Sequence, residues 1–267
     1  MEFCFTTIAS GSSGNCIYIG SEKNNLLIDA GISGKKVEQG LATIGVDPSN
    51  LNGIFITHEH HDHIKGVGVL ARRYRLPIYA TPLTWQAIEQ MDTIVGDIPQ
   101  ECKQVVQKDK EILINDIVVQ PYGIPHDAAE PVAYSFYKNK KKISVATDLG
   151  HTNDYIEKNL AESNLILLEA NHDIDMLEVG AYPYFLKQRI LGSSGHLCNE
   201  VAGQILSRLY HPKLEVAILG HLSRENNFPA LAYQTVYNEL VADDIGLLSS
   251  FQLKVAEREG VTDIYQI

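Results

Sequence analysis

Histidine and aspartate side chains are concentrated in one short segment, Thr57 to His63, which reads Thr-His-Glu-His-His-Asp-His. The segment holds four of the ten histidines of the chain. Neutral imidazole nitrogens and a carboxylate are the ligands that borderline divalent cations such as zinc or manganese bind. A solvated polar turn would not need so many histidines together, so the segment predicts a metal site.

The segment directly follows an apolar run, Gly53 to Ile56, which we expect to be a buried strand. Residues two apart at the end of a strand point to the same side, so His58 and His60 can bind one ion. The chain must then turn, which allows Asp62 and His63 to face a second ion.

Apolar runs and turn residues predict the elements that bring other parts of the chain to this site. We expect strands at residues 3–9, 16–20, 25–29, 53–56, 77–80, 132–137, 142–146, 165–169, 214–219 and 250–255, with further short strands between 103 and 122. We expect helices at residues 33–44, 64–75, 83–91, 153–162, 199–209 and 229–240. This alternation predicts an α/β protein, α+β in some schemes, in which one domain of residues 1–267 packs sheet on sheet with helices outside.

Composition describes an ordinary globular protein, with 45% hydrophobic and 21% charged residues. We expect a cytoplasmic protein with no membrane contact, because no apolar run approaches the roughly 20 residues that span a bilayer. The four cysteines have no C-x-x-C spacing and are expected to be free thiols. A net charge of −11 argues against an indiscriminate nucleic-acid coat. It does not exclude a nuclease, because bound metal ions carry positive charge of their own.

Several strand ends and loops carry polar residues whose role the pattern alone leaves open. The loop from Ser10 to Asn15 either exposes backbone N–H groups to a phosphate or simply connects two strands. Asp29 either orients a ligand histidine or stabilises a turn. Single polar residues of this kind are weak signals when each is taken alone: His126, Asp148, Glu169, His172, His196 and His221.

The order of these residues resembles the metallo-β-lactamase superfamily, whose core signature is His-x-His-x-Asp-His. Its ligand positions are matched in order by His58, His60, Asp62, His63, His126, Asp148 and His221. The resemblance implies a four-layer αββα sandwich of two mixed sheets with helices outside. It also implies two divalent ions, zinc or manganese with iron as a further option. His61, His151 and His211 match no motif position and are predicted not to be ligands.

By the same resemblance, one ion is held by three histidines, here called the histidine triad: His58, His60 and His126. The other is held by the mixed triad: Asp62, His63 and His221. Asp148 is expected to lie between the two ions. The resemblance also implies an orienting role for Asp29.

Within the superfamily, the chain is similar over its whole length to the YycJ/WalJ type, and its His-Leu-Ser-Arg segment looks like ribonuclease Z. The matching motifs include Ala9 to Asn15, Asn171-His172-Asp173, Gly195-His196-Leu197 and Gly220 to Ser223. The resemblance implies a nuclease of the 5′ exonuclease kind. The chain departs from it at Asp148-Leu-Gly-His151, where these relatives usually have Asp-Thr-Gly-Tyr.

Residue roles follow from this resemblance. His196 is the expected general acid, since the pKa of an imidazole suits proton transfer near neutral pH, and Glu169 is its expected partner. Asp62 is assigned to the catalytic group as well as to the ligands. Residues expected to support the ligands or contact the substrate are Ser12, Asn15, Asp29, His172 and Ser223; for His172, a structural role is the alternative.

The leading functional hypothesis is a two-metal phosphodiesterase that cleaves DNA, with RNA as a second substrate. The alternative is a small-molecule metallo-hydrolase acting on a thioester, a lactone or a cyclic phosphodiester. A non-enzymatic regulatory protein ranks third, because every ligand position is filled. The sequence leaves the native metal and the oligomeric state open, with a homodimer among the options.

Overall fold

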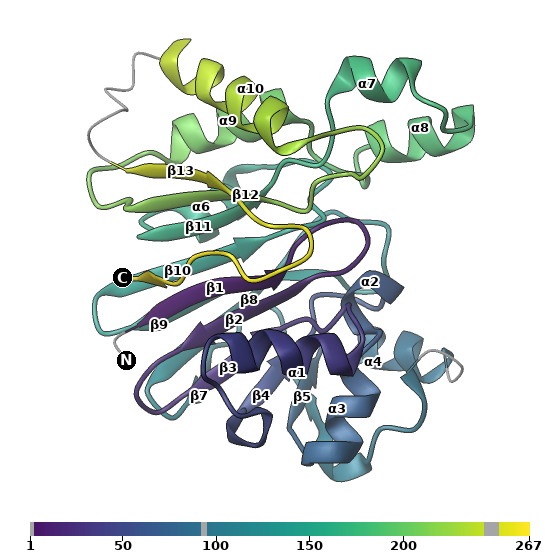
Figure 1. Cartoon of the computed structure of the whole chain (residues 1–267), viewed down its shortest axis with the longest axis vertical. Helices are drawn as coiled ribbons and strands as arrows, with labels where there is room; N and C mark the ends of the chain where they lie inside the picture. Colours follow the sequence, from purple (N-terminus) through teal and green to yellow (C-terminus); the bar gives the residue numbers. More distant parts are fainter. Residues whose placement is uncertain (1–2, 92–94, 243–250) are drawn as a thin grey trace.

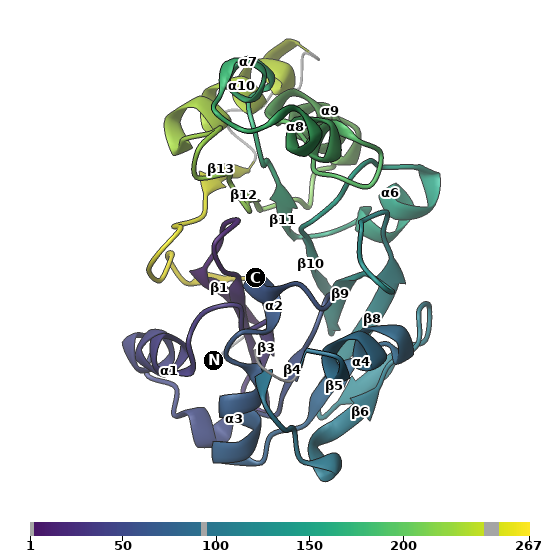
Figure 2. The ribbon, with the colours of Figure 1, turned by 90° about the vertical axis from the view of Figure 1, so that its right-hand side faces the viewer.

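The computed structural model describes residues 3–91, 95–242 and 251–267. Two seven-stranded sheets pack face to face, with helices on both outer surfaces. Figure 1 and Figure 2 show α1, α3 and α4 at one end of the molecule and α9 and α10 at the other, with the strands between them. The expected αββα sandwich of two mixed sheets is therefore confirmed.

The first sheet has the strand order β14-β1-β2-β3-β4-β5-β6. Strands β3 to β6 run parallel, whereas β14, β1, β2 and β3 pair antiparallel. Parallel neighbours end at the same edge, so the residues that follow β3 and β4 come together there. The strands are β1 (Cys4–Ala9), β2 (Cys16–Gly20), β3 (Asn25–Ile28), β4 (Gly53–Phe55), β5 (Ile78–Ala80), β6 (Lys103–Val105) and β14 (Tyr265–Gln266).

The second sheet has the order β13-β12-β11-β10-β9-β8-β7, with β10 to β13 parallel. Its parallel strands deliver three of the expected site residues, at or just after the ends of β10, β11 and β12. The strands are β7 (Ile112–Ile114), β8 (Ile117–Gly123), β9 (Val132–Lys138), β10 (Lys141–Ala146), β11 (Leu165–Glu169), β12 (Val216–Gly220) and β13 (Gln252–Val255). Of the strand expected at 250–255, residue 250 lies outside the described residues.

Three apolar clusters hold the layers together. One fills the space between the sheets and includes Phe5, Phe55, Tyr134 and Phe136, all buried. The second packs the outer face of the first sheet against α1 (Gly34–Thr43), α3 (Val67–Tyr74) and α4 (Pro82–Glu89). The third packs the second sheet against α6 (Asp154–Leu160), α9 (Asn199–Leu209) and α10 (Pro229–Ala242).

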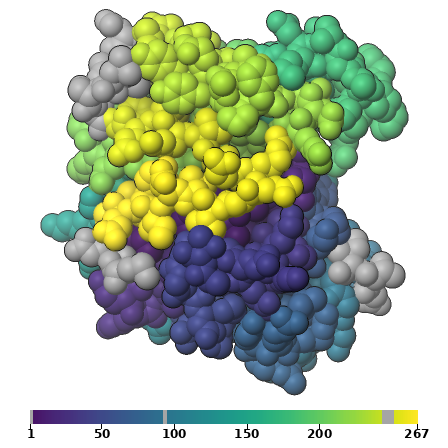
Figure 3. Space-filling model, in the orientation of Figure 1, coloured from purple at the N-terminus to yellow at the C-terminus, as the bar shows by residue number. Residues whose placement is uncertain are grey.

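The C-terminal segment connects the two halves of the molecule. Figure 3 shows it as a band across the surface between α10 and α1. It ends in β14, which pairs with β1, and sequence reasoning had not identified this two-residue strand. None of the helices in the described part of the chain is long and apolar enough to cross a membrane.

The prediction of a single helix at residues 64–75 was wrong. The structure has two helices, α2 (His61–Ile64) and α3, separated at Lys65 and Gly66. The backbone N–H of Gly66 donates to the carbonyl of Ala30 at 2.7 Å, and a Cβ at Gly66 would lie 2.4 Å from the carbonyl oxygen of Ile32. The helix therefore breaks where its backbone packs against the loop after β3. Two short helices that the sequence analysis did not predict also occur, α7 (Ile174–Val179) and α8 (Tyr184–Leu191).

Gly31 tests how closely this loop is packed. A Cβ there would lie 1.5 Å from the carbonyl oxygen of Asp62, so Gly31→Ala must displace the backbone that carries the metal-site residues. We expect a loss of roughly 3 kcal/mol in the free energy of unfolding, at the upper end of overpacking effects. Urea denaturation measures it.

Gly123→Ala is the control, because its nearest neighbour would be the flexible end of Lys108 at 3.0 Å. Equal stability of the two variants would contradict this account of Gly31.

Candidate metal centre

The loop from Thr57 to His63 is held by both sheets. The N–H of Thr57 donates to the Asp29 carboxylate at 2.9 Å, and its carbonyl accepts from the N–H of Val132, in the second sheet, at 3.0 Å. The carbonyl oxygens of Asp62 and His63 accept from the N–H groups of Asn15 and Ala30, each at 2.8 Å. These backbone contacts therefore fix both ends of the loop.

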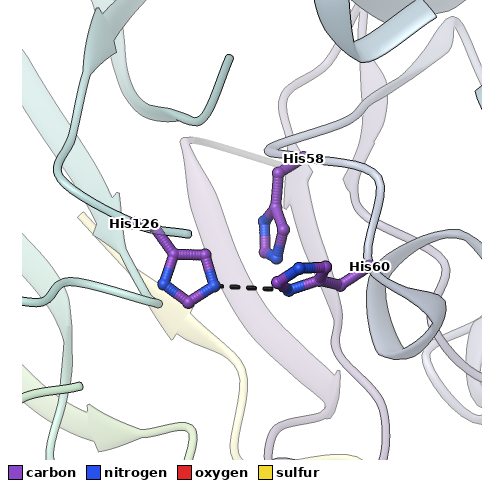
Figure 4. A group of neighbouring side chains, drawn as sticks. All are labelled: His58, His60 and His126. Carbon is purple, nitrogen blue, oxygen red and sulfur yellow. Dashed lines mark hydrogen bonds between the residues drawn. The ribbon is translucent and has the colours of Figure 1, made fainter. Parts of the chain in front are cut away.

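The histidine triad comes together from both sheets. Its ring nitrogens lie within 4.8 Å of one another, and Figure 4 shows the three rings turned toward a common point. Nε2 of His126 is 3.3 Å from Nδ1 of His60. Burial lowers the pKa of His126, so the ring is neutral, and its Nδ1 donates to the carbonyl of Gly195 at 3.2 Å. This tautomer leaves the lone pair of Nε2 pointing into the triad.

The mixed triad lies next to the histidine triad, and its potential ligand atoms also lie within 4.8 Å of one another. Asp148 stands between the two groups. Its carboxylate oxygens are 3.1 Å from Nε2 of His63, 3.2 Å from Nε2 of His221 and 3.7 Å from Nε2 of His126. Burial opposes ionisation, but His221 and His63 outweigh it and hold the pKa of Asp148 well below its usual range. Asp148 is therefore an anionic group in contact with residues of both triads.

His58 provides a test of whether these residues fit metal ions. The ring is completely buried, and its Nε2 has no hydrogen-bond partner among the described residues. Burial, with the nearby charge of His63, lowers the pKa of His58, so the ring is neutral. An unpaired buried nitrogen is costly, and a cation removes that cost. Imidazole and carboxylate donors suit zinc, manganese or iron, so the residues present fit two divalent ions.

Asp29 and Thr57 set the orientation of two of these histidines. The carboxylate of Asp29 accepts from Nδ1 of His63 at 2.7 Å and from the Thr57 hydroxyl at 2.8 Å. The Thr57 oxygen lies 3.0 Å from Nδ1 of His58 and, having donated its proton, can accept from that nitrogen. Each contact leaves Nε2 of the histidine facing the centre, as outer hydrogen bonds do in metal sites.

His196 and Glu169 form a second pair at the rim of the centre. Nδ1 of His196 donates to Oε1 of Glu169 at 2.7 Å, and Oε2 accepts from the N–H groups of Leu149 and Leu197 at 2.8 and 3.2 Å. Burial of the ring opposes protonation, but the Glu169 carboxylate outweighs it and raises the pKa of His196 to about 9. Both oxygens of Glu169 accept hydrogen bonds, and the one from Nδ1 sets the orientation of the His196 ring, although Glu169 and His196 also lie within reach of Asp148 and His221 as a potential metal-binding group.

The other predicted residues lie at different distances from the centre. Asn15 contacts two histidines of the mixed triad, with Nδ2 3.2 Å from Nε2 of His63 and Oδ1 3.3 Å from Nδ1 of His221. Ser12 and Ser223 contact no ligand histidine in the hydrogen bonds described. They line a pocket of about 250 Å³ beside His196, here called the front pocket. His172 lies apart from both triads, in the wall of a separate pocket.

The three histidines predicted not to be ligands belong to none of the potential metal-binding groups in the described part of the chain. His61 is exposed at the start of α2, and His211 bonds to the carbonyl of Ser163 at 2.9 Å. His151 donates through Nδ1 to the carbonyl of Ser193 at 2.7 Å, which turns that nitrogen away from the ligands.

Sequence reasoning assigned no role to three residues that shape the centre. Thr57 orients His58 and His63, and the only sequence signal was its place directly before the first histidine. Asn171 donates to the carbonyl of His221 at 3.0 Å. Arg189 pairs with Asp127 in the front pocket, a contact between segments far apart in the sequence.

Three site residues have a backbone conformation that is uncommon outside glycine. Asp29, Asp148 and His221 have φ values of 57°, 57° and 55°, in the left-handed region. Each lies at or just after the end of a strand, where this conformation turns the chain sharply. Such residues persist only where the surrounding contacts over-determine them, and they are concentrated at functional sites.

The metal-site residues lie within the part of the chain that matches a known protein family. A family model described as a beta-lactamase superfamily domain matches residues 24–221, which include the complete ligand set. The chain belongs to the metallo-β-lactamase superfamily.

Among members of this superfamily, the chain is 38% identical over 267 residues to exodeoxyribonuclease YycJ of Bacillus anthracis, covering 100% of both chains. It is 40% identical over 265 residues to exodeoxyribonuclease WalJ of Streptococcus pneumoniae, covering 99% of this chain and 98% of the relative. The fold is similar to that of YhfI from Bacillus subtilis, with a TM-score of 0.72 at 18% identity, covering 98% of this chain and 100% of that one. It is also similar to the short form of human tRNase Z, with a TM-score of 0.64 at 16% identity, covering 97% and 98%.

Asp29→Asn tests the orienting role of this carboxylate in a metallo-β-lactamase-type centre. The asparagine side chain is uncharged, so its hydrogen bond from Nδ1–H of His63 would be weaker than that of the carboxylate. We therefore expect metal affinity to fall roughly 10- to 100-fold. Competition with a coloured zinc chelator measures the affinity, and metal-dependent protection against heat gives a second readout.

The exposed carboxylate of Asp263 supplies the matched control. Asp263→Asn should bind metal like the wild-type chain. Unchanged affinity in Asp29→Asn would show that His63 is oriented without this contact.

Proposed function

We propose that this protein is a two-metal phosphodiesterase that degrades DNA as a 5′ exonuclease, with RNA as a second substrate, in the cytoplasm. The observation that carries the proposal is the His196–Glu169 pair, which places an imidazole beside the ligand cluster with its Nδ1 bound by a carboxylate that raises its pKa. Phosphodiester cleavage expels an alkoxide, and a proton donor at that place favours the reaction. Full-length similarity to proteins named exodeoxyribonucleases supports DNA as the substrate.

The histidine triad would hold one divalent ion and the mixed triad the other, with Asp148 shared between them. When bound, such a pair of ions activates a water molecule and neutralises charge on the phosphoryl oxygens. Asp62 belongs to this group through its contact with Nε2 of His63 at 3.5 Å. The protein contributes rigidity, because the ligand side chains project from loops tied to both sheets.

His196 would supply the proton for the leaving oxygen. The oxygen of water bonds to phosphorus and its proton passes to solvent, the bond from phosphorus to the O3′ of the released nucleotide breaks, and O3′ takes the proton from Nε2 of His196, which solvent then restores. Glu169 is bound to Nδ1, so it leaves Nε2 to face the substrate and stabilises the protonated ring. The side chain of His196 is 21% exposed, which gives a strand access to it, whereas Glu169 is completely buried.

The front pocket would receive the strand next to the scissile phosphate. Ser12 and Ser223 offer hydroxyl groups there, and the Arg189 side chain is 56% exposed although it is paired with Asp127. A net charge of −11 does not prevent this, because the positive charges needed are local. The four cysteines are free and buried, which agrees with a reducing compartment.

A substrate panel tests the proposal. Protein loaded with zinc or with manganese is incubated with 5′-labelled single-stranded DNA, duplex DNA, RNA and a thioester. We expect metal-dependent release of mononucleotides from DNA, faster than from RNA, resolved on a denaturing gel. Turnover of the thioester alone would overturn the proposal and favour a small-molecule hydrolase.

His196→Ala tests the proton donor. We expect kcat on DNA to fall roughly 10²- to 10⁴-fold, the usual range for a general acid, with metal content unchanged. Bis(p-nitrophenyl) phosphate gives a sharper readout, because p-nitrophenolate leaves without a proton. The variant should lose far less activity on this substrate than on DNA.

His211→Ala is the control, because His211 bonds to Ser163 and belongs to no potential metal-binding group of the described residues. His196 would not be the proton donor if His196→Ala lost activity on DNA and on bis(p-nitrophenyl) phosphate by the same factor. Loss of bound metal in the variant would also exclude that role.

A further inference from the structure

The hairpin of α7 and α8 carries the two most exposed aromatic side chains of the described residues. Tyr184 is 77% exposed and Phe185 is 74% exposed, and Val179 at the end of α7 is 87% exposed. Of the eight residues of α8 only Ile190 is buried, so this helix adds little to the core. Figure 1 and Figure 2 show the hairpin at the side of the molecule that carries α2. Large apolar side chains gathered at one exposed place mark a binding surface.

One face of α8 also lines the front pocket. Leu186, Arg189 and Ile190 are three and four residues apart, so they share this face, and all three line the pocket. Phe185 precedes Arg189 by four residues, which places it beside Arg189, one helical turn or about 5.4 Å along the axis. Tyr182, just before the helix, lines the pocket as well. The exposed aromatic surface is therefore continuous with the pocket beside the metal centre.

The helix α8 is positively charged in a chain whose net charge is −11. Residues 180–195 contain two cationic side chains, Lys187 and Arg189, and no acidic one. The ammonium group of Lys187 donates to the backbone carbonyl of Glu178 at 2.7 Å, and this carbonyl has no net charge, so the contact does not neutralise Lys187. Arg189 remains exposed although it pairs with Asp127. Positive charge beside exposed rings suits a partner with negative charge and flat apolar faces.

We propose that α8 binds single-stranded DNA, with bases stacked on Tyr184 and Phe185 and with Lys187 facing the backbone phosphates. This inference rests on the proposed function. Aromatic rings that receive unpaired bases, together with cations that follow the phosphates, are the two components of sequence-independent single-strand binding. The strand on the 3′ side of the scissile phosphate would leave the front pocket along this helix.

The same surface would discriminate between single strands and duplexes. Paired bases have both faces covered by their neighbours in the duplex, so they cannot stack on an exposed ring. A strand can follow α8 only where its bases are unpaired. We therefore expect single strands, and duplexes that end in a single strand, to be the preferred substrates.

A second copy of this chain is the other occupant that an exposed apolar surface can have. A symmetric dimer brings the same surface of both copies together. It would therefore place Lys187 and Arg189 of one copy against the same residues of the other, and like charges repel. The charge of α8 and its continuity with the front pocket favour DNA.

Phe185→Leu and Phe185→Trp together test the proposal. Leucine keeps an apolar side chain but has no ring on which a base can stack, whereas tryptophan keeps one. The probe is a fluorescent strand of 12 thymidines with phosphorothioate linkages, which resist cleavage. By fluorescence anisotropy we expect Phe185→Leu to bind this strand at least about fivefold more weakly than wild type, and Phe185→Trp to bind at least as tightly as wild type. Equal binding by Phe185→Leu and wild type would overturn the proposal.

Tyr233→Leu is the matched control, because Tyr233 is an exposed ring of α10 that does not line the front pocket. It should bind the strand like wild type, and an equal loss in both leucine variants would contradict a specific surface on α8. A blunt duplex of 12 base pairs should bind wild type and Phe185→Leu alike. Light scattering covers the other occupant: a wild-type dimer that Phe185→Asp converts to a monomer would make α8 an interface between copies and overturn the proposal.

Steady-state kinetics separate this inference from the proposed function. On an unmodified strand of 12 thymidines, Phe185→Leu should raise KM at least about fivefold and leave kcat unchanged. On a dinucleotide, which has only one nucleotide beyond the scissile phosphate, both constants should match wild type. Cleavage of the long strand with an unchanged KM would overturn the surface and leave the nuclease standing. Strand binding that needs Phe185, in a protein that cleaves no DNA, would support the surface and overturn the nuclease.

Discussion

The contact on which the centre depends is the hydrogen bond from Nδ1 of His63 to the buried carboxylate of Asp29. It joins the loop after β3 to the loop after β4, and the same carboxylate holds the backbone and the hydroxyl of Thr57. Burial raises the pKa of Asp29, which His63 and Thr57 oppose by bonding to the charged form. Because one carboxylate bonds both to Thr57 and to Nδ1 of His63, the position of the loop and the orientation of the His63 ring are determined together.

The charge states of the ligand histidines also depend on the balance between burial and nearby carboxylates. Burial favours the neutral form of His63, but Asp148, Asp29 and Asp62 outweigh it and raise its pKa well above the usual range. His58, which lacks such a direct partner, is held neutral by burial. The cluster thus pairs buried carboxylates with imidazoles, and divalent ions would take the place of the proton on His63. The left-handed backbone at Asp29, Asp148 and His221 is a second sign that the fold maintains this arrangement at a cost.

His196 stands where the ligand cluster meets the front pocket, 3.7 Å from Asp148. Glu169 reaches it from the end of β11, and its second oxygen is bound by two backbone N–H groups. Because Glu169 is fixed in this way, His196 has one orientation available, with Nε2 free.

The sequence by itself determined the local part of this protein. His58, His60, Asp62 and His63 lie within six residues, so their spacing along a strand end and a turn indicates a metal site without any tertiary information. Apolar periodicity located most strands and helices, and the order of the later ligands indicated the superfamily. Tertiary structure decided what depends on long-range contact: the break at Gly66, the Thr57–Asp29 bond, and the burial of Nε2 of His58 with no partner in the described residues. The physical reason is that a hydrogen bond, a packed glycine or an unpaired nitrogen depends on atoms from distant segments, which residue spacing does not contain.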